Sequence, residues 1–198
     1  MKKLIPFLAV ILLGTACQEE QQTYPSIITE MTDAYVNEQG VMHKIETDQG
    51  AVYTLTNPQK DFEPQSIYRV LSGFVPLSAG TAQLYQMKGV YLLRDSSAIA
   101  QKDPTGVLSA WRAGKYINLH LSPKTQGGKQ YWGFAVDSVS AGHTRISLHH
   151  RLNNDAPAYT QDTYASIPVD SIASAAQGDT ITITVATFEG NKTWTFKK

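Results

Sequence analysis

The chain has 198 residues with equal numbers of basic and acidic side chains, 17 of each, and only 17% of its residues are charged. No segment concentrates Lys and Arg as binding to nucleic-acid phosphates requires, so no nucleic-acid partner is expected. The single cysteine, Cys17, excludes an internal disulfide and a zinc site built from cysteines.

The first 17 residues have the order of a secretory signal. Lys2 and Lys3 form a basic start, residues 4–13 are mostly apolar, and small residues at 14–16 lead to Cys17. The apolar run has about 10 residues, whereas a helix that spans a bilayer needs about 20. We therefore expect an export signal rather than a permanent transmembrane helix.

Cys17 stands where a bacterial lipoprotein carries its lipid. We expect residues 1–16 to be removed as a lipoprotein signal peptide and Cys17 to carry acyl chains such as palmitate, which anchor the chain in the membrane. Residues 17–23 have no apolar side chain after the cysteine and are expected to be a flexible tether. Glu19 and Glu20 resemble the surface-export signal of some Gram-negative lipoproteins. The expected location is the outer membrane, exposed at the cell surface, with the periplasmic side as the alternative.

Residues 24–95 are predicted to form a small barrel of about five strands. In GVMHKIETDQGAVYTLTN, the odd-numbered residues of 41–47 fall on one face, and DQG supplies the turn to a second strand. Pro58 and Pro64 are expected to exclude a central strand from NPQKDFEPQ. SIYRVLSGFVPL predicts a strand that bends near Gly73, and TAQLYQMKGVYLLRD predicts one or two more. This strand number suits a closed or partly closed barrel.

Residues 96–106, SSAIAQKDPTG, interrupt the strand pattern and are predicted to be a linker. In residues 107–198, short alternating runs such as KYINLHLS and QYWGFAVDSV predict a sandwich of roughly six to eight strands. YASIPVDSI is short and contains Pro168, so it is expected at the edge of a sheet. DTITITVATFEGNKTWTFKK is predicted to be a hairpin. The chain lacks the cysteine pair of an immunoglobulin-type disulfide.

This arrangement resembles the NigD-like lipoprotein family over most of the mature chain. The resemblance lies in the lipoprotein signal, the segment DQGAVYTLTNPQKDFEPQSIYRVLSGFVPL, the polar linker and the C-terminal sandwich. It implies an all-β fold, with an N-terminal OB-like five-stranded barrel followed by a C-terminal immunoglobulin-like β-sandwich. It also implies an association with bacteriocin-linked genes. The family's molecular function is not established, so the resemblance implies no catalytic residues.

The sequence contains no motif of a common catalytic or metal site. A Gly-x-Ser-x-Gly nucleophile elbow and a phosphate-binding glycine loop are both absent, and the acidic residues fall mostly at predicted turns. The five histidines are His43, His120, His143, His149 and His150. The adjacent His149 and His150 should point to opposite faces of a strand, and His120 and His149 are expected to face outward. We therefore expect no enzyme activity, no cofactor and no metal.

Aromatic side chains that alternate away from the predicted core form the expected binding surface. They are Trp111, Tyr116, Tyr131 and Tyr159. Exposed aromatic rings stack on sugars, peptides or partner proteins, although aromatic residues on neighbouring strands also stabilise a sheet by pairing. The sequence thus predicts a lipid-anchored, non-catalytic module that binds a glycan, a peptide or a protein. The alternative is a structural or accessory subunit of an outer-membrane assembly.

Overall fold

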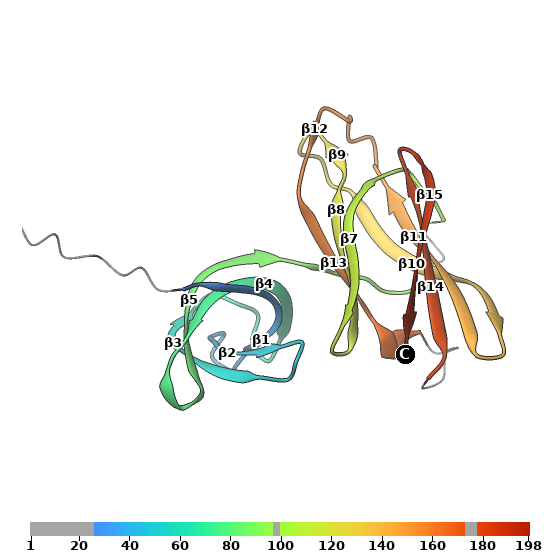
Figure 1. Cartoon of the computed structure of the whole chain (residues 1–198). Helices are drawn as coiled ribbons and strands as arrows, with labels where there is room; N and C mark the ends of the chain where they lie inside the picture. The colour runs from blue at the N-terminus through green and yellow to red at the C-terminus, as the bar shows by residue number, and fades with distance from the viewer. Residues whose placement is uncertain (1–25, 97–99, 173–177) are drawn as a thin grey trace, which may run out of the picture.

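The computed structural model describes residues 26–96, 100–172 and 178–198, which form a barrel and a sandwich (Figure 1). The predicted signal peptide, the tether and Cys17 lie outside the described residues. Two short 3-10 helices, η1 (Ser78–Gly80) and η2 (Val169–Ser171), accompany the strands. Within the described residues, no helix has the length and apolar character needed to cross a bilayer.

Five strands form the barrel: β1 (Ile28–Val36), β2 (Met42–Thr47), β3 (Val52–Gln59), β4 (Ile67–Pro76) and β5 (Thr81–Gly89). Their order is β1-β2-β3-β5-β4, and β1 closes the barrel by pairing with β4. β3 and β5 pair in parallel at Thr54–Thr81 and Leu55–Ala82, whereas the other pairs are antiparallel. This topology is that of an OB-like barrel, so the predicted fold of the first half is confirmed.

The barrel core depends on bulges that break simple alternation. A bulge between Met42 and Lys44 turns Met42 and Ile45 inward, and both side chains are fully buried. The prediction that the odd-numbered residues of 41–47 share one face is therefore wrong before the bulge, where Met42 lies on the same face as Ile45, because one extra residue reverses the alternation. The predicted bend near Gly73 is present as a second bulge, next to the buried Phe74.

β3 continues through Pro58, where the sequence was expected to exclude a central strand. β3 pairs with β5 only at Thr54 and Leu55, so at Pro58 the edge of β3 that faces β5 has no ladder hydrogen bond for the missing proline N–H to break. The side chain of Asn57 links β3 to β5 instead. Its amide nitrogen donates to the carbonyl oxygen of Leu84 at 2.7 Å, and its amide oxygen accepts from the Leu84 N–H at 2.9 Å.

Ten strands build the second half: β6 (Tyr91–Leu92), β7 (Gly106–Ala113), β8 (Tyr116–Ser122), β9 (Lys124–Thr125), β10 (Tyr131–Ser140), β11 (His143–Arg151), β12 (Tyr159–Thr160), β13 (Thr163–Pro168), β14 (Thr180–Thr187) and β15 (Gly190–Lys197). One sheet has the order β10-β11-β14-β15 and the other β6-β13-β8-β7, while β9 and β12 form a small separate pair. The two large sheets enclose a core that includes Ile117, Leu119, Phe134, Ile146 and Ile183. The predicted sandwich and its last hairpin, β14–β15, are confirmed.

β13 lies inside its sheet rather than at the predicted edge. It pairs with β8 along its whole length and with β6 at Ala165 and Ser166. Pro168 is its last residue, directly before η2, so the missing N–H falls where the strand ends. The prediction was wrong because it placed the proline within the strand instead of at its terminus.

The described part of the predicted linker, residues 96 and 100–106, is paired with the sandwich. The Ser96 N–H donates to the Phe134 carbonyl at 2.8 Å, and the Asp103 N–H donates to the His150 carbonyl at 2.9 Å. The barrel ends at Gly89, and β6 already belongs to the sandwich sheet. In the structure, therefore, the chain passes from barrel to sandwich near Val90, and the polar segment completes the edges of the sandwich instead of separating two bodies.

Candidate functional site

The outer face of the sheet β6-β13-β8-β7 meets the barrel. Strand register places Trp111, Asn118 and Ser166 in one row and Ser109, His120 and Tyr164 in the next. These side chains alternate with core residues, so they point away from the sandwich interior. Figure 1 shows the barrel beside this sheet.

A buried ionic cluster joins the two domains at this face. The Arg69 side chain, from β4, is only 1% exposed and lies 2.8 Å from an Asp48 oxygen and 3.3 Å from an Asp33 oxygen. On the sandwich side it donates to Ser166 Oγ and Asn118 Oδ1, each at 3.1 Å. Its donors are therefore shared between barrel carboxylates and sandwich side chains, which fixes the angle at which the domains meet.

Tyr116 completes the cluster from the sandwich. Its hydroxyl lies 3.0 Å from both Asp33 oxygens, and the Arg69 guanidinium lies 3.9 Å from the centre of its ring. Burial and the negative charge of Asp33 raise the pKa of Tyr116, so the hydroxyl stays protonated and donates. Lys115 adds a second cation, with Nζ 2.7 Å from Asp33. Both carboxylates are thus held by fixed donors, an arrangement suited to holding the domains together rather than to proton transfer.

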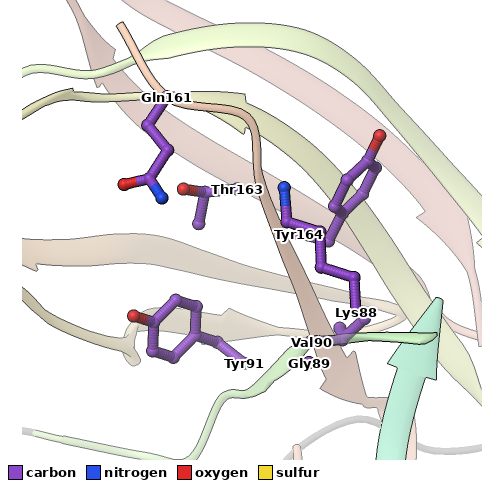
Figure 2. A pocket seen from close by; sticks show the side chains of 7 residues that line it. All are labelled: Lys88, Gly89, Val90, Tyr91, Gln161, Thr163 and Tyr164. Carbon is purple, nitrogen blue, oxygen red and sulfur yellow. The ribbon is translucent and has the colours of Figure 1, made fainter. Parts of the chain in front are cut away.

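Two hollows lie beside this cluster. The first, the junction hollow, has a volume of about 330 Å³ and is lined by Lys88, Gly89, Val90, Tyr91, Gln161, Thr163 and Tyr164. Figure 2 shows the side chains of Tyr91, Gln161 and Thr163 directed toward a common space, while Lys88 runs alongside Tyr164. Tyr91 is 50% exposed, so its ring is available to a ligand.

The second, the seam hollow, has a volume of about 370 Å³ and lies between the two domains. It is lined by Thr29, Glu30, Met31, Asp48, Gln49, Leu71, Trp111, Ala113 and Tyr164. Its walls come from both domains: Met31 and Leu71 from the barrel, Trp111 and Tyr164 from the sandwich. Because Tyr164 lines both hollows, the two hollows adjoin each other.

Tyr164 is held in place by neighbouring side chains. Its ring stacks on His120 at 4.3 Å with a 15° angle between the planes, and His120 Nε2 lies 3.1 Å from Asp162 Oδ1. The Lys88 ammonium donates to the Asp162 carbonyl at 2.7 Å and lies 5.3 Å from the Tyr164 ring centre. Lys88 belongs to the barrel, so this is a further tie between the domains.

The four aromatic residues predicted to bind do not meet at one site. Trp111 lines the seam hollow, whereas Tyr116 is only 7% exposed and belongs to the buried cluster. The prediction that Tyr116 is an exposed platform is wrong, because the barrel covers the face on which it lies. Tyr131 is half-buried beside Arg151, and Tyr159 is 54% exposed on β12.

The sequence analysis missed Tyr91 and Tyr164. Tyr164 lies beside His120 on the outer face of its sheet because β13 pairs with β8, whereas β13 was expected at a sheet edge with no partner assigned. Tyr91 was assigned to the barrel half, whereas it lies on the short β6 strand of the sandwich. Knowledge of these two strand pairings would have been needed to find the residues.

His149 and His150 are both buried, although His149 was expected to face outward. Ser96 and Asp103 contact them: His149 Nδ1 lies 3.3 Å from the Ser96 carbonyl oxygen, and His150 Nδ1 lies 3.0 Å from that of Asp103. The His150 ring stacks on Trp132 at 3.8 Å. Among the described residues, no group of three or more histidine, cysteine or acidic side chains is arranged to hold a metal ion.

The stability of the protein is expected to fall on acidification because of His150. Burial lowers the pKa of His150 below its ordinary value of 6.5. Below pH 6.5 the unfolded chain therefore binds a proton before the folded chain does, so stability is lost as pH falls from 6.5 toward the folded-state pKa and levels off below it. The urea midpoint should fall between pH 7.5 and pH 5, and by less in His150→Gln. An equal fall in both proteins would contradict this role of His150.

Comparisons with known proteins show what the chain is similar to. No curated protein matches it. Among solved structures it is similar to a NigD-like immunity protein from Bacteroides caccae, with 25% identity, a TM-score of 0.66, and coverage of 87% of this chain and 93% of that chain. A candidate toxin-related protein from Parabacteroides distasonis has 14% identity, a TM-score of 0.70 and the same coverage. A candidate lipoprotein from Bacteroides fragilis has 12% identity, a TM-score of 0.62, and coverage of 87% and 98%.

The family model of the NigD-like C-terminal beta sandwich domain matches residues 90–198. Its first residue falls where the chain leaves the barrel in the structure, one residue after the end of β5 at Gly89. The matched region is more than half of the chain, and this chain therefore belongs to the NigD-like family.

Proposed function

We propose that the chain is a lipid-anchored protein of the bacterial cell envelope that binds a glycan, a peptide or a protein without transforming it. The observation that carries the proposal is the pair of adjoining hollows at the domain seam, with Tyr91, Tyr164 and Trp111 in their walls. Ligand sites commonly lie between domains, where aromatic walls and a few polar groups come together.

The proposal does not include catalysis. Asp33 and Asp48 are occupied by Arg69, and Asp155 accepts hydrogen bonds from Thr125, from Gln130 and from backbone N–H groups. These hydrogen bonds, that from Thr125 above all, lower the pKa of Asp155 to about 2. A general base needs a carboxylate within hydrogen-bond reach of a substrate proton, whereas these three carboxylates are engaged by side chains and backbone groups of the protein.

The anchor part of the proposal rests on the sequence. Lys2, Lys3, the apolar run 4–13 and Cys17 follow the order of a lipoprotein signal. The structural similarity to a candidate lipoprotein is in keeping with this reading. We propose that the mature chain is held at the outer membrane through Cys17 and is displayed at the cell surface, with a periplasm-facing position as the alternative.

The anchor is tested by Cys17→Ser. Without the thiol no acyl chain is attached, so the variant either stays in the inner membrane through its uncleaved signal or is released if another peptidase cuts near residue 16. We expect incorporation of a labelled fatty acid to be lost and the thermal midpoint of the folded part to be unchanged, because the tether separates the cysteine from β1. Continued acyl labelling, or unchanged antibody access at the cell surface, would contradict the assignment.

A second candidate function is that of an accessory subunit in an outer-membrane assembly, associated with a bacteriocin system. The similarity to a NigD-like immunity protein at 25% identity favours this alternative. The two functions are separated by solubilising the membranes in detergent and purifying the tagged chain. A stoichiometric membrane-protein partner would support the accessory function, whereas a monomer that binds glycans or peptides would support the binding module.

A further inference from the structure

We propose that the junction hollow and the seam hollow form one groove for a neutral oligosaccharide, whose sugar rings lie against Tyr91, Tyr164 and Trp111. This inference rests on the proposed binding function and names the ligand class of the same site. The volumes of about 330 and 370 Å³ both fall within the roughly 300–1,000 Å³ that is usual for small-molecule sites. Because Tyr164 is shared, a ligand longer than one sugar can contact both hollows.

The aromatic walls come from three strands of one sheet. Tyr164 is held by its stack on His120, which covers one face of its ring, and the ring of Tyr91 lies 6.3 Å from that of Trp132. Trp111 stands on the outer face of its sheet, in the row of Asn118 and Ser166, which bind Arg69. A flat ring held in place stacks on the C–H face of a sugar at low entropic cost.

Four uncharged polar side chains are available in the groove. Gln161 and Thr163 in the junction hollow and Thr29 and Gln49 in the seam hollow line these spaces. None of these four side chains makes a hydrogen bond to another of the described residues. Amide and hydroxyl groups both donate and accept, as sugar hydroxyls require.

The charged residues of the groove balance one another. Asp48 is paired with Arg69, so its charge is compensated. Lys88 in the junction hollow donates to the Asp162 carbonyl and keeps its positive charge, while Glu30 in the seam hollow carries a negative charge. The two remaining charges are opposite in sign, so the groove has no net charge, which favours a neutral oligosaccharide over a strongly charged ligand.

A strand edge lies beside the groove. Extended peptides commonly bind by adding a strand to an open sheet edge. At the junction hollow β6 is the terminal strand of its sheet and pairs with β13 only at Ala165 and Ser166. A peptide that adds to this edge is therefore kept as an outcome of the test.

The test is an array of neutral oligosaccharides of increasing length, run beside an array of extended peptides, with the full-length chain in detergent micelles. We expect binding to neutral oligosaccharides that strengthens with length, and a roughly tenfold loss in Tyr91→Ala and in Trp111→Ala. Tyr85→Ala is the matched control, because Tyr85 is 47% exposed on the barrel and lies outside both hollows. Affinity should persist when the salt rises from roughly 0.05 to 0.5 M, since no ionic contact is involved.

Each other result overturns the inference. Peptide binding without glycan binding would overturn the ligand class and retain the proposed binding function. Glycan binding that Tyr85→Ala weakens as much as Trp111→Ala would overturn the location. Failure of both arrays together with recovery of a stoichiometric membrane partner would overturn both this inference and the binding function.

Discussion

Replacing Arg69 by methionine is expected to lower the free energy of unfolding by about 3–5 kcal/mol, because removal of one partner from a buried ionic cluster leaves Asp48 without a cation and Asp33 with Lys115 alone. Asp33 and Asp48 have side chains that are only 5% and 7% exposed, so water cannot replace the guanidinium without opening the interface. The measurement is urea denaturation followed by tryptophan fluorescence. Methionine keeps most of the volume, so the loss reports the charge and its hydrogen bonds.

The control for Arg69→Met is Lys102→Met. Lys102 pairs with Asp137 at 3.5 Å, and both side chains are more than a third exposed, so its loss should cost less than about 1 kcal/mol. A second variant adds Asp33→Asn and Asp48→Asn to Arg69→Met and should regain part of the stability, because no buried charge is left unpaired. Equal stability of Arg69→Met and Lys102→Met would show that the cluster does not hold the domains.

Replacing Gly114 by alanine is expected to cost about 2–4 kcal/mol and to loosen the contact between barrel and sandwich. Gly114 has a φ of +50°, and a β-carbon there would lie 2.2 Å from the backbone oxygen of Asp48. The clash is with backbone, so relief requires the β7–β8 turn to move away from the barrel. Hydrogen exchange of Asp48 and Asn118 should rise, and the urea midpoint should fall.

Gly50→Ala is the matched control for Gly114→Ala. Gly50 also has a positive φ, +84°, but no atom lies within 4 Å of a β-carbon built there. Its substitution should cost only the backbone strain, about 1 kcal/mol. If the two variants lose the same stability, the close approach of Gly114 to Asp48 is not part of the interface.

The strands of both domains were predictable because their apolar residues alternate and their turns contain glycine or proline. The barrel was recognised from its strand count, and the hairpin β14–β15 from the alternation of Ile181, Ile183 and Val185. Bulges escaped prediction, as at Met42, because an extra residue leaves no mark in local composition. The effects of Pro58 and Pro168 on their strands were hard to predict for a related reason. A proline is tolerated in a strand where the edge it faces is unpaired, and the local sequence does not show which edge that is.

The domain interface could not be predicted from the sequence. Arg69, Asp33 and Asp48 come from three barrel segments, and their partners Asn118 and Ser166 come from two strands of the sandwich. In sequence each of these residues is an ordinary polar residue of a strand or turn. Only the docking of the barrel on the sheet β6-β13-β8-β7 brings them together.

The same docking explains why Trp111 lines a hollow whereas Tyr116 is buried. Both side chains lie on the outer face of one sheet. The barrel covers nearly all of Tyr116 but leaves Trp111 at the margin of the contact, where it lines the seam hollow. Alternation identifies the face of a strand, whereas the neighbouring domain decides which part of that face remains accessible.

The central claim is that the barrel and the sandwich form one rigid unit whose seam carries the binding groove. It is tested most directly by the distance between spin labels on the two domains, measured by pulsed electron resonance at the exposed sites Lys60→Cys and Asn191→Cys in a Cys17→Ser background. The account predicts a single narrow distance distribution, which broadens when Arg69→Met is added. A broad distribution without that substitution, or one that Arg69→Met leaves unchanged, would contradict it.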